Sequence, residues 1–342
     1  MKASSIVPAL TVEARLKRRL REHLSNLGFS RNNEGLLAPP GDDKAAIRAL
    51  HEGQRRDRLQ THKAFLKANL SELSTHFANG SDIDPQSISL RLQKIEAGTF
   101  ESALFRLATL TWSVPVSNGF GRRLRYLVWD EHNNKLAGLF AIGDPVFNLS
   151  VRDKLVGWNS RDRCRRLVNI LDAYVLGAVP PYNMLIGGKV IACLVRTREV
   201  FDDFSAKYGD MPGIISGKKK KASLLAVTTT SSLGRSSIYN RLKLEEIEYF
   251  RAIGYTEGWG HFHISDRLFG DLRDYLRVLE HPYADLNRFG QGPNWRLRTI
   301  RAALKSLGFD ESMFRHGIRR QVFISEFASN ALDILRTGNH HR

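Results

Sequence analysis

The chain has few of the features that mark secreted, membrane-spanning or disulfide-bonded proteins. It has only two cysteines, Cys164 and Cys193, so neither a disulfide framework nor a zinc site of paired cysteines can be built. It lacks any run of about 18 uncharged apolar residues, and residues 1–10 lack a basic cluster and a small-residue cleavage site. We therefore predict a cytoplasmic protein that does not bind a membrane.

Several catalytic signatures are also missing. The sequence contains no Gly-x-Ser-x-Gly elbow and no Walker loop, which excludes a helicase or ATPase motor in this polypeptide. Asp144, Asp153 and Asp162 are scattered rather than spaced as the carboxylates of a two-metal nuclease are. We predict no metal site.

Acidic residues are scarce relative to basic ones. Lysine and arginine number 52 against 35 aspartates and glutamates, and the formal net charge is +17 at pH 7. Such a charge creates a positive potential that attracts polyanions and speeds their encounter. The predicted partner is therefore nucleic acid. We expect DNA before RNA, although the charge alone does not separate the two. The hydrophobic content of 42% can fill the cores of two or three compact units.

Residues 1–105 form the predicted N-terminal unit, which is helical and basic. Leu16, Leu20 and Leu24 repeat at helical spacing, and Gly28 follows as a stop signal. Arginines and lysines crowd the rest of this first helix. One face is therefore expected to pack and the others to be cationic.

Residues 106–268 form the predicted α+β core. Apolar stretches on both sides of Asn133 and Asn134 predict a β-hairpin. The other expected elements follow in chain order: strands over 170–179, 223–229 and 259–264, and helices over 185–208 and 236–242. Strands that alternate with helices predict a central sheet with helices on its faces.

Residues 269–342 form the predicted C-terminal unit, again helical and basic. Asn294 is suited to cap a helix whose buried face includes Ile300 and Leu304, while Arg298 and Arg301 lie on a neighbouring face. Basic clusters of this kind neutralise phosphates without reading base sequence. The residues predicted to contact nucleic acid are Lys218, Lys219, Lys220, Lys221, Arg296, Arg298, Arg301, Arg319 and Arg320.

A hydroxyl-rich turn follows the strand predicted at 223–229. Gly234 and Arg235 open the next helix, and Ser236 and Ser237 come directly after them. A helix start with free backbone amides, hydroxyls and an arginine suits a phosphate or another anion. We predict that Arg235, Ser236 and Ser237 bind an anion, although serines also cap helices without any ligand.

The segment 173–190 joins a strand end to a helix start and reads AYVLGAVPPYNMLIGGKV. Its two prolines stop the ladder of hydrogen bonds, and Gly187 and Gly188 let backbone approach closely. This layout resembles the central motif of the GCN5-related acyltransferase fold. In that fold a splayed strand and the following glycine-rich helix start hold the pyrophosphate of coenzyme A. The resemblance implies a cofactor-binding role for Gly187, Gly188 and Lys189.

The order of the later elements extends this resemblance. It implies that Tyr239 falls near the tyrosine that acts as general acid in that fold. Met184 stands where that fold prefers glutamine or arginine, and Lys189 replaces a small residue. The resemblance therefore predicts an acyltransferase-like central mixed sheet with helical flanks, but it leaves the cofactor unknown.

Two histidines alternate in the segment Gly258–Ile264. On a strand, His261 and His263 would share one face. They can serve as a metal pair, a proton relay or phosphate contacts, but a metal site needs a third ligand that the neighbouring sequence does not supply. The candidate catalytic residues are therefore Tyr239, His261 and His263.

Six longer strings keep a fixed order along the chain: LVGWNSRDRCRRLVNI, DAYVLGAVPPYNMLIGGK, TTTSSLGRSSIYNRL, GWGHFHI, GPNWRLRTIRAALKSLGF and FRHGIRRQVF. Together they resemble the successive motifs of the DruA family of Druantia anti-phage defence proteins. The resemblance implies a component of a Druantia antiviral system that acts with a large helicase-like protein. It implies no catalytic residue.

Three functions are consistent with these observations. The leading hypothesis is a nucleic-acid-binding defence component that works with the helicase-like partner. The alternative is an acyl- or group-transfer enzyme that takes a nucleotide-bearing donor and uses Tyr239 as proton donor. The third is a scaffold that only recruits the partner.

Overall fold

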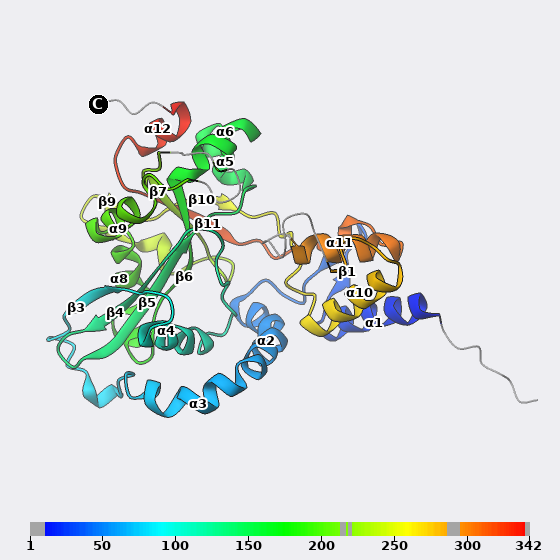
Figure 1. Cartoon of the computed structure of the whole chain (residues 1–342), viewed down its shortest axis with the longest axis horizontal. Coiled ribbons are helices and arrows are strands. Elements are labelled where there is room, and N and C mark those ends of the chain that lie inside the picture. The colour runs from blue at the N-terminus through cyan, green and yellow to red at the C-terminus, as the bar shows by residue number, and fades with distance from the viewer. Residues whose placement is uncertain (1–10, 213–216, 218–220, 286–294, 339–342) are drawn as a thin grey trace, which may run out of the picture. The chain divides into compact units, whose positions relative to one another are not determined.

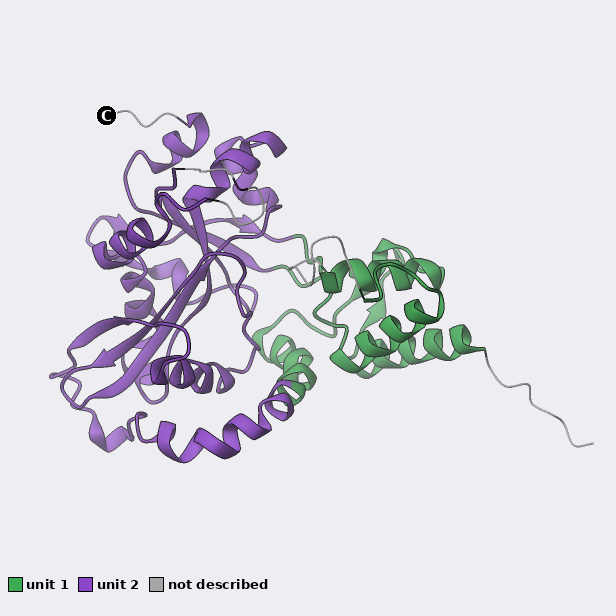
Figure 2. Ribbon diagram, viewed as in Figure 1, with its two compact units in different colours: residues 1–57, 257–319 green, residues 58–256, 320–342 purple. Residues whose placement is uncertain are grey.

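The computed structural model describes residues 11–212, 217, 221–285 and 295–338. The chain folds into two compact units (Figure 2). Unit 1 takes in Met1–Asp57 and Glu257–Arg319, and unit 2 takes in Arg58–Thr256 and Arg320–Arg342. Each unit combines two stretches that are far apart in sequence. The division into consecutive segments at residues 105 and 268 stays a prediction.

Unit 2 is built on a seven-stranded mixed sheet in the order β10-β11-β7-β6-β5-β4-β3 (Figure 1). Neighbouring strands are antiparallel except β6 and β7, which run parallel. The strands are β3 (Leu90–Lys94), β4 (Arg123–Asp130), β5 (Lys135–Gly143), β6 (Ile170–Ala178), β7 (Ala226–Thr230), β10 (Arg251–Tyr255) and β11 (Gln321–Glu326). The predicted α+β class, with a central mixed sheet and helical flanks, is confirmed at this level.

Alternate residues of the central strands pack into cores on opposite faces of the sheet. In β4, Tyr126 and Val128 join one core, whereas Leu127 and Trp129 join the other. The first core is covered by α8 (Gly187–Leu194) and α9 (Arg198–Tyr208), and the second by α3 (Lys63–Ser74) and α4 (Phe100–Leu110). A third buried cluster lies between the sheet and two short helices, α5 (Ser150–Val156) and α12 (Ala331–Thr337).

Short elements connect these strands and helices. They are the helices α6 (Ser160–Arg166) and α7 (Tyr182–Leu185), the 3-10 turns η1 (Gly80–Asp82), η2 (Leu167–Asn169) and η3 (Tyr239–Arg241), and the strands β8 (Lys243–Leu244) and β9 (Ile247–Glu248). Among the described helices of the whole chain, none is long and apolar enough to cross a membrane.

The predicted hairpin is confirmed as β4 and β5. Its turn contains Asn133 and Asn134, and Asn134 adopts a left-handed backbone with φ 56°. Asparagine tolerates that conformation better than most residues do. The side-chain oxygen of Asn133 accepts a hydrogen bond from the backbone N–H of Lys135 at 3.0 Å, which fixes the turn from within.

Unit 1 is mostly helical. Its elements are α1 (Val12–Asn26), the strands β1 (Ser30–Arg31) and β2 (Leu37–Ala38), the first part of α2 (Lys44–Thr61), α10 (Asp266–Val278), α11 (Trp295–Ser306) and η4 (Glu311–Phe314). As predicted, Leu16, Leu20 and Leu24 form the buried face of α1. The helix at α11 is also confirmed, with Ile300 and Leu304 buried, whereas its expected cap Asn294 lies outside the described residues.

Two predicted elements are wrong. Residues 259–264 do not form a strand: Trp259 makes a single β-bridge to Arg315, and turns follow it. Gly258 at φ 66° and Gly260 at φ 153° interrupt the extended backbone that a strand needs. The helix predicted over 236–242 is only the turn η3, because the two-stranded β8-β9 sheet begins immediately after it.

Candidate functional site

The parallel pairing of β6 and β7 stops partway along both strands. The paired residues are Ile170 with Ala226, Leu171 with Val227, and Asp172 with Thr228. Beyond this point β6 pairs only with β5, and a shift in register leaves Tyr174 as an extra, bulged residue. We call Asp172, Ala173, Thr228 and Thr229 the branch point, since the two strands part there.

Two threonine hydroxyls tie the branch point together. Thr228 donates a hydrogen bond from Oγ1 to Oδ1 of Asp172 at 2.8 Å, and Thr229 donates from Oγ1 to the carbonyl oxygen of Ala173 at 2.9 Å. Burial raises the pKa of Asp172 to about 6, against the opposing effects of the Thr228 hydrogen bond and the charge of Arg152. A carboxyl group with such a pKa can gain or lose a proton near neutral pH.

Tyr239 lies close enough to Asp172 for the charge of that carboxylate to affect its pKa. Its ring packs between Phe250 and Phe323, with ring centroids 5.0 Å away in each case. Burial raises the pKa of Tyr239 to about 12, and Asp172 acts in the same direction while a hydrogen bond with Thr229 opposes the rise. Tyr239 therefore holds its proton at neutral pH, as a proton donor must.

The structure brings the predicted anion-binding turn, Arg235 to Ser237, next to the predicted cofactor-binding helix start, Gly187 to Lys189. A Cβ at Gly188, in the first turn of α8, would lie 2.8 Å from Cδ1 of Ile238, so the start of α8 packs against the turn that follows Arg235. Arg235, Ser237 and Lys189 are exposed. Gly187, at φ 59°, has nothing within 4 Å of the position where its Cβ would stand.

Ser236 has a structural role in that turn. It is buried, and its Oγ accepts hydrogen bonds from the backbone N–H groups of Ile238 and Tyr239, both at 3.1 Å. Its own N–H donates to Oε1 of Gln321 on β11 at 3.3 Å. These contacts account for Ser236 without a ligand, and they leave Arg235 and Ser237 as the groups of the turn that are open to one.

His261 and His263 do not share a strand face, because their segment is a turn. His263 is buried, donates from Nε2 to the carbonyl oxygen of Met313 at 2.9 Å, and its Nδ1 contacts no hydrogen-bonding partner among the described residues. Burial lowers the pKa of both His261 and His263 to about 4. Both rings are therefore neutral at pH 7. Within the described ranges, no group of three metal-ligating side chains gathers.

The predicted nucleic-acid contacts on α11 differ in exposure. Arg298 and Arg301 are exposed, and Arg301 pairs with Glu311 at 2.9 Å. Arg296 is half-buried: it pairs with Asp266 at 2.7 Å, and its guanidinium lies 4.4 Å from the centre of the Phe269 ring. Arg296 therefore holds α11 against α10 and is less available to a ligand than Arg298.

The remaining basic predictions are scattered. Lys221 and Arg319 are exposed, whereas Arg320 is half-buried just before β11, where its backbone N–H donates to Oγ1 of Thr256 at 3.0 Å. Lys218, Lys219 and Lys220 lie outside the described residues. Of the residues predicted to contact nucleic acid, Arg298 and Arg301 on α11 are therefore the two that are described, exposed and close together in one element.

Sequence reasoning missed two residues that the structure singles out. Asp172 is the one carboxylate in the apolar stretch ILDAYVLGA of β6, and a charged residue inside such a stretch is a signal that could have identified it. Trp259 is 40% exposed next to Arg301. The signal in the sequence was its position between two glycines, but only the neighbouring histidines were predicted to be functional.

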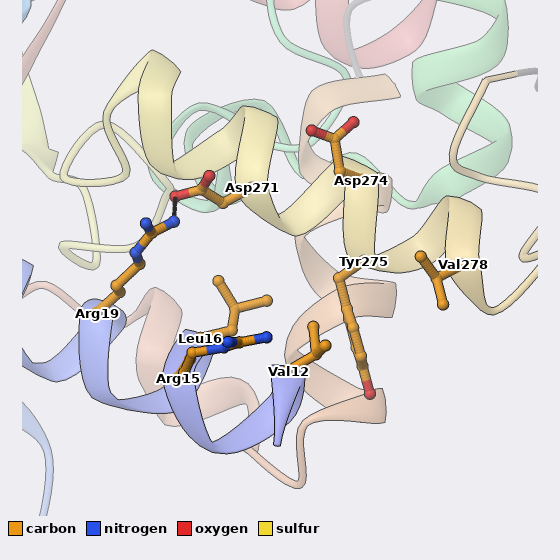
Figure 3. Close-up of a pocket in the computed structure, with 8 residues that line it drawn as sticks. All are labelled: Val12, Arg15, Leu16, Arg19, Asp271, Asp274, Tyr275 and Val278. Carbon is orange, nitrogen blue, oxygen red and sulfur yellow. Dashed lines mark hydrogen bonds and ion pairs between the residues drawn. The ribbon is translucent and has the colours of Figure 1, made fainter. Parts of the chain in front are cut away.

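A groove in unit 1 lies between α1 and α10 (Figure 3). It has a volume of about 380 Å³, and Arg19 pairs across it with Asp271 at 3.0 Å. The other lining residues are Val12, Arg15, Leu16, Asp274, Tyr275 and Val278. None of the residues predicted to be functional lines this groove.

Comparison with known proteins identifies a family and a curated relative. The model of the family described as Druantia protein DruA matches residues 41–337. A curated protein from Escherichia coli (strain UMEA 4076-1), described as Druantia protein DruA, is 60% identical over 326 residues, which cover 95% of this chain and 81% of that protein. No solved structure matches the chain.

Proposed function

The chain belongs to the DruA family, the family of a component of the Druantia anti-phage defence system, and on that premise we propose that it serves defence by binding DNA through α11. One observation supports this most directly. Arg298, Arg301 and Lys305 are exposed at spacings of three and four on α11, while Ile300 and Leu304 are buried. A helix that packs one face and presents a row of cations on another is suited to the phosphates of a nucleic-acid backbone.

The double variant Arg298→Glu and Arg301→Glu tests this proposal. Each lost phosphate contact reduces the steepness of log Kd against log salt by about 0.9 for duplex DNA. The double variant should therefore bind more weakly and flatten that slope by about 1.8. The matched control is Lys154→Glu with Arg198→Glu, which changes the net charge equally at two exposed residues of unit 2.

Equal affinity of the α11 variant and the parent protein at every salt concentration would show that α11 is not the contact surface. An RNA of the same sequence is measured beside the DNA. Tighter binding of the RNA would overturn the preference for DNA.

We also propose the helicase-like Druantia protein as the partner and the cytoplasm as the place where they act. A DNA-binding subunit that lacks a motor signature needs a separate motor to move along or unwind DNA. Co-purification of tagged chain with the helicase-like protein, with and without nuclease treatment, tests a direct contact. If the association disappears completely after nuclease treatment, the two proteins are linked only through DNA and do not contact each other directly.

The second candidate is group transfer at the branch point, in a core that we propose to be GCN5-acyltransferase-like. It is favoured by a parallel strand pair that separates where Asp172 and Tyr239 lie. Gly187 fits close approach of a ligand, but the space beside Gly188 is filled by Ile238. The glycine pair therefore supports a pyrophosphate site only in part, and the cofactor is not identified.

Thermal stability in the presence of coenzyme A and a panel of nucleotides tests the second candidate, since a ligand bound only by the folded state raises the Tm. A shift that Arg235→Ala abolishes would support it, as would a loss of defence in Tyr239→Phe that leaves folding and DNA binding intact. No shift with any of these ligands, together with full defence in Tyr239→Phe, would rule it out.

A further inference from the structure

Trp259 is a large aromatic side chain that is firmly held and yet exposed. Its neighbours Gly258 and Gly260 both join the chain around η4: the N–H of Gly260 donates to the carbonyl oxygen of Phe314 at 2.8 Å, and the N–H of Gly317 donates to that of Gly258 at 3.1 Å. The Trp259 backbone also bridges to Arg315. These contacts fix the main chain on both sides of Trp259, although 40% of the residue is accessible to solvent.

At Gly258 the backbone lies against the backbone of Gly317, and this contact keeps the Trp259 segment in place. Its φ is 66°, and a Cβ there would lie 2.8 Å from the carbonyl carbon of Gly317. Only glycine fits without strain at such a position. The Gly-Trp-Gly sequence therefore serves to hold the indole at the surface, and the tryptophan itself is not needed to fill a core.

The surroundings of the indole combine aromatic and cationic groups. The ring centroid of Phe314, which is buried, lies 5.4 Å from that of Trp259. The guanidinium of Arg301 lies 5.7 Å from the centre of the Trp259 ring. Arg315, which bridges to Trp259, and Arg298, one turn before Arg301 on α11, are exposed. An aromatic surface among arginines attracts a ligand with flat rings and negative charge.

We propose that Trp259 is a stacking platform for an unpaired base of single-stranded DNA, whose phosphates are bound by Arg298, Arg301 and Arg315. This inference rests on the proposed function of α11 and narrows it from DNA in general to a single strand. Bases stack on aromatic side chains wherever their faces are free. In a duplex those faces are occupied by the neighbouring base pairs, so a duplex can use only the arginines.

The experiment compares four proteins on three probes. The proteins are the full-length parent, Trp259→Leu, Trp259→Phe, and the double variant Arg298→Glu with Arg301→Glu. The probes are a single-stranded oligonucleotide, its duplex, and a single strand of equal length made of abasic sites. Leucine keeps an apolar contact with Phe314 but has no ring, whereas phenylalanine keeps a ring.

Trp259→Leu should weaken binding of the single strand by about tenfold to a hundredfold, the range for loss of one stacked base. It should leave the duplex and the abasic strand unchanged, and Trp259→Phe should retain most of the affinity. The double arginine variant should weaken all three probes. A melting temperature within a few degrees of the parent shows that each variant is folded.

Two outcomes separate the stacking proposal from the function on which it rests. If Trp259→Leu binds all three probes as the parent does while the arginine variant binds them weakly, the stacking site is wrong and DNA binding by α11 stands. If the arginine variant binds every probe as the parent does, the proposed function fails first. Equal weakening of single strand and abasic strand in Trp259→Leu would also overturn stacking.

Discussion

At the scale of the residue, Asp172 gives the clearest prediction. Its folded pKa is about 6, raised by burial above the ordinary value of 3.8. The folded state therefore holds this proton more tightly than the unfolded state does, and this residue's contribution to stability falls as pH rises from about 4 to about 6. Asp172→Asn cannot ionise and still accepts the hydrogen bond from Thr228. It should be more stable than the parent at pH 8, by on the order of 1–2 kcal/mol.

Urea unfolding of the parent and Asp172→Asn at pH 4.5 and pH 8 measures this difference. Asp202→Asn is the matched control, because Asp202 is exposed on α9, and its effect should be small at both pH values. A destabilised Asp172→Asn at pH 8 would mean that the carboxylate is needed in its ionised form.

At the scale of the element, the turn Gly258–Ile264 predicts sensitivity to acid. The pKa values of His261 and His263 are lowered to about 4 by burial, so the unfolded chain takes up protons at a higher pH than the folded chain does. The stability of unit 1 should be complete above about pH 6.5 and fall as the pH drops toward 4. In the variant His263→Gln, the side-chain amide can still donate a hydrogen bond to the carbonyl oxygen of Met313, but it cannot titrate.

Hydrogen exchange of the amides in α10 and α11 between pH 7 and pH 5, corrected for the intrinsic rate, measures that loss. His263→Gln should show a shallower pH dependence than the parent. If exchange depends on pH equally in both proteins, protonation of His263 does not cause the loss of stability in acid.

A glycine of this turn, Gly258, and a glycine of the following helix α10, Gly270, should respond in opposite ways to replacement by alanine. Gly258→Ala places a Cβ against the backbone of Gly317 and Ile318 at a φ of 66°, and should cost about 1–3 kcal/mol of unfolding free energy. Gly270→Ala lies inside α10 with nothing within 4 Å of its Cβ position, and should stabilise by up to about 1 kcal/mol. Chemical denaturation of the two variants gives both values, and a neutral Gly258→Ala would show that the two segments can move apart.

Elements with strong local signals could be predicted from the sequence, and those fixed by distant contacts could not. The leucine repeat of α1 and the asparagine turn between β4 and β5 act within a few residues, and both were correct. The short strand β11 lies in a stretch assigned to the helical C-terminal unit. It is a strand because β7 and β10 pair with it on both sides. The strand expected at 259–264 failed because glycine conformations are not visible in a hydrophobic pattern.

The candidate site shows the same limit. The sequence pointed to Arg235, Ser236 and Ser237 together, but burial distinguishes the capping Ser236 from its exposed neighbours. It also grouped Arg296 with Arg298. In the fold, Arg296 pairs with Asp266 and lies over the Phe269 ring, whereas Arg298 is exposed. Asp172 stands out in the sequence as a carboxylate inside an apolar strand, but its contact with Thr228 exists only because β7 pairs with β6. Residue type predicted the chemistry of these groups, whereas their availability depended on packing.

At the scale of the whole molecule, the two units should respond to pH in opposite directions. Between about pH 4 and pH 6, acidification weakens unit 1 through His261 and His263 and strengthens unit 2 through Asp172. Exchange rates of the amides in α11 and in β6, measured in one sample at pH 6.5 and pH 4.5 and corrected for the intrinsic rate, should therefore shift with opposite signs. A common shift would mean that other groups dominate both units.

The strand order of unit 2 has a consequence for how the protein is made. β11 lies between β7 and β10 in the sheet, yet it begins at Gln321, after residues 257–319 of unit 1. On the ribosome, β7 and β10 are finished long before the strand that joins them, and each then carries an edge without its final neighbour. Such edges pair readily with other chains. The nascent chain is thus the form of this protein that is most prone to aggregate. A chain truncated before Gln321 lacks β11 and cannot complete the sheet.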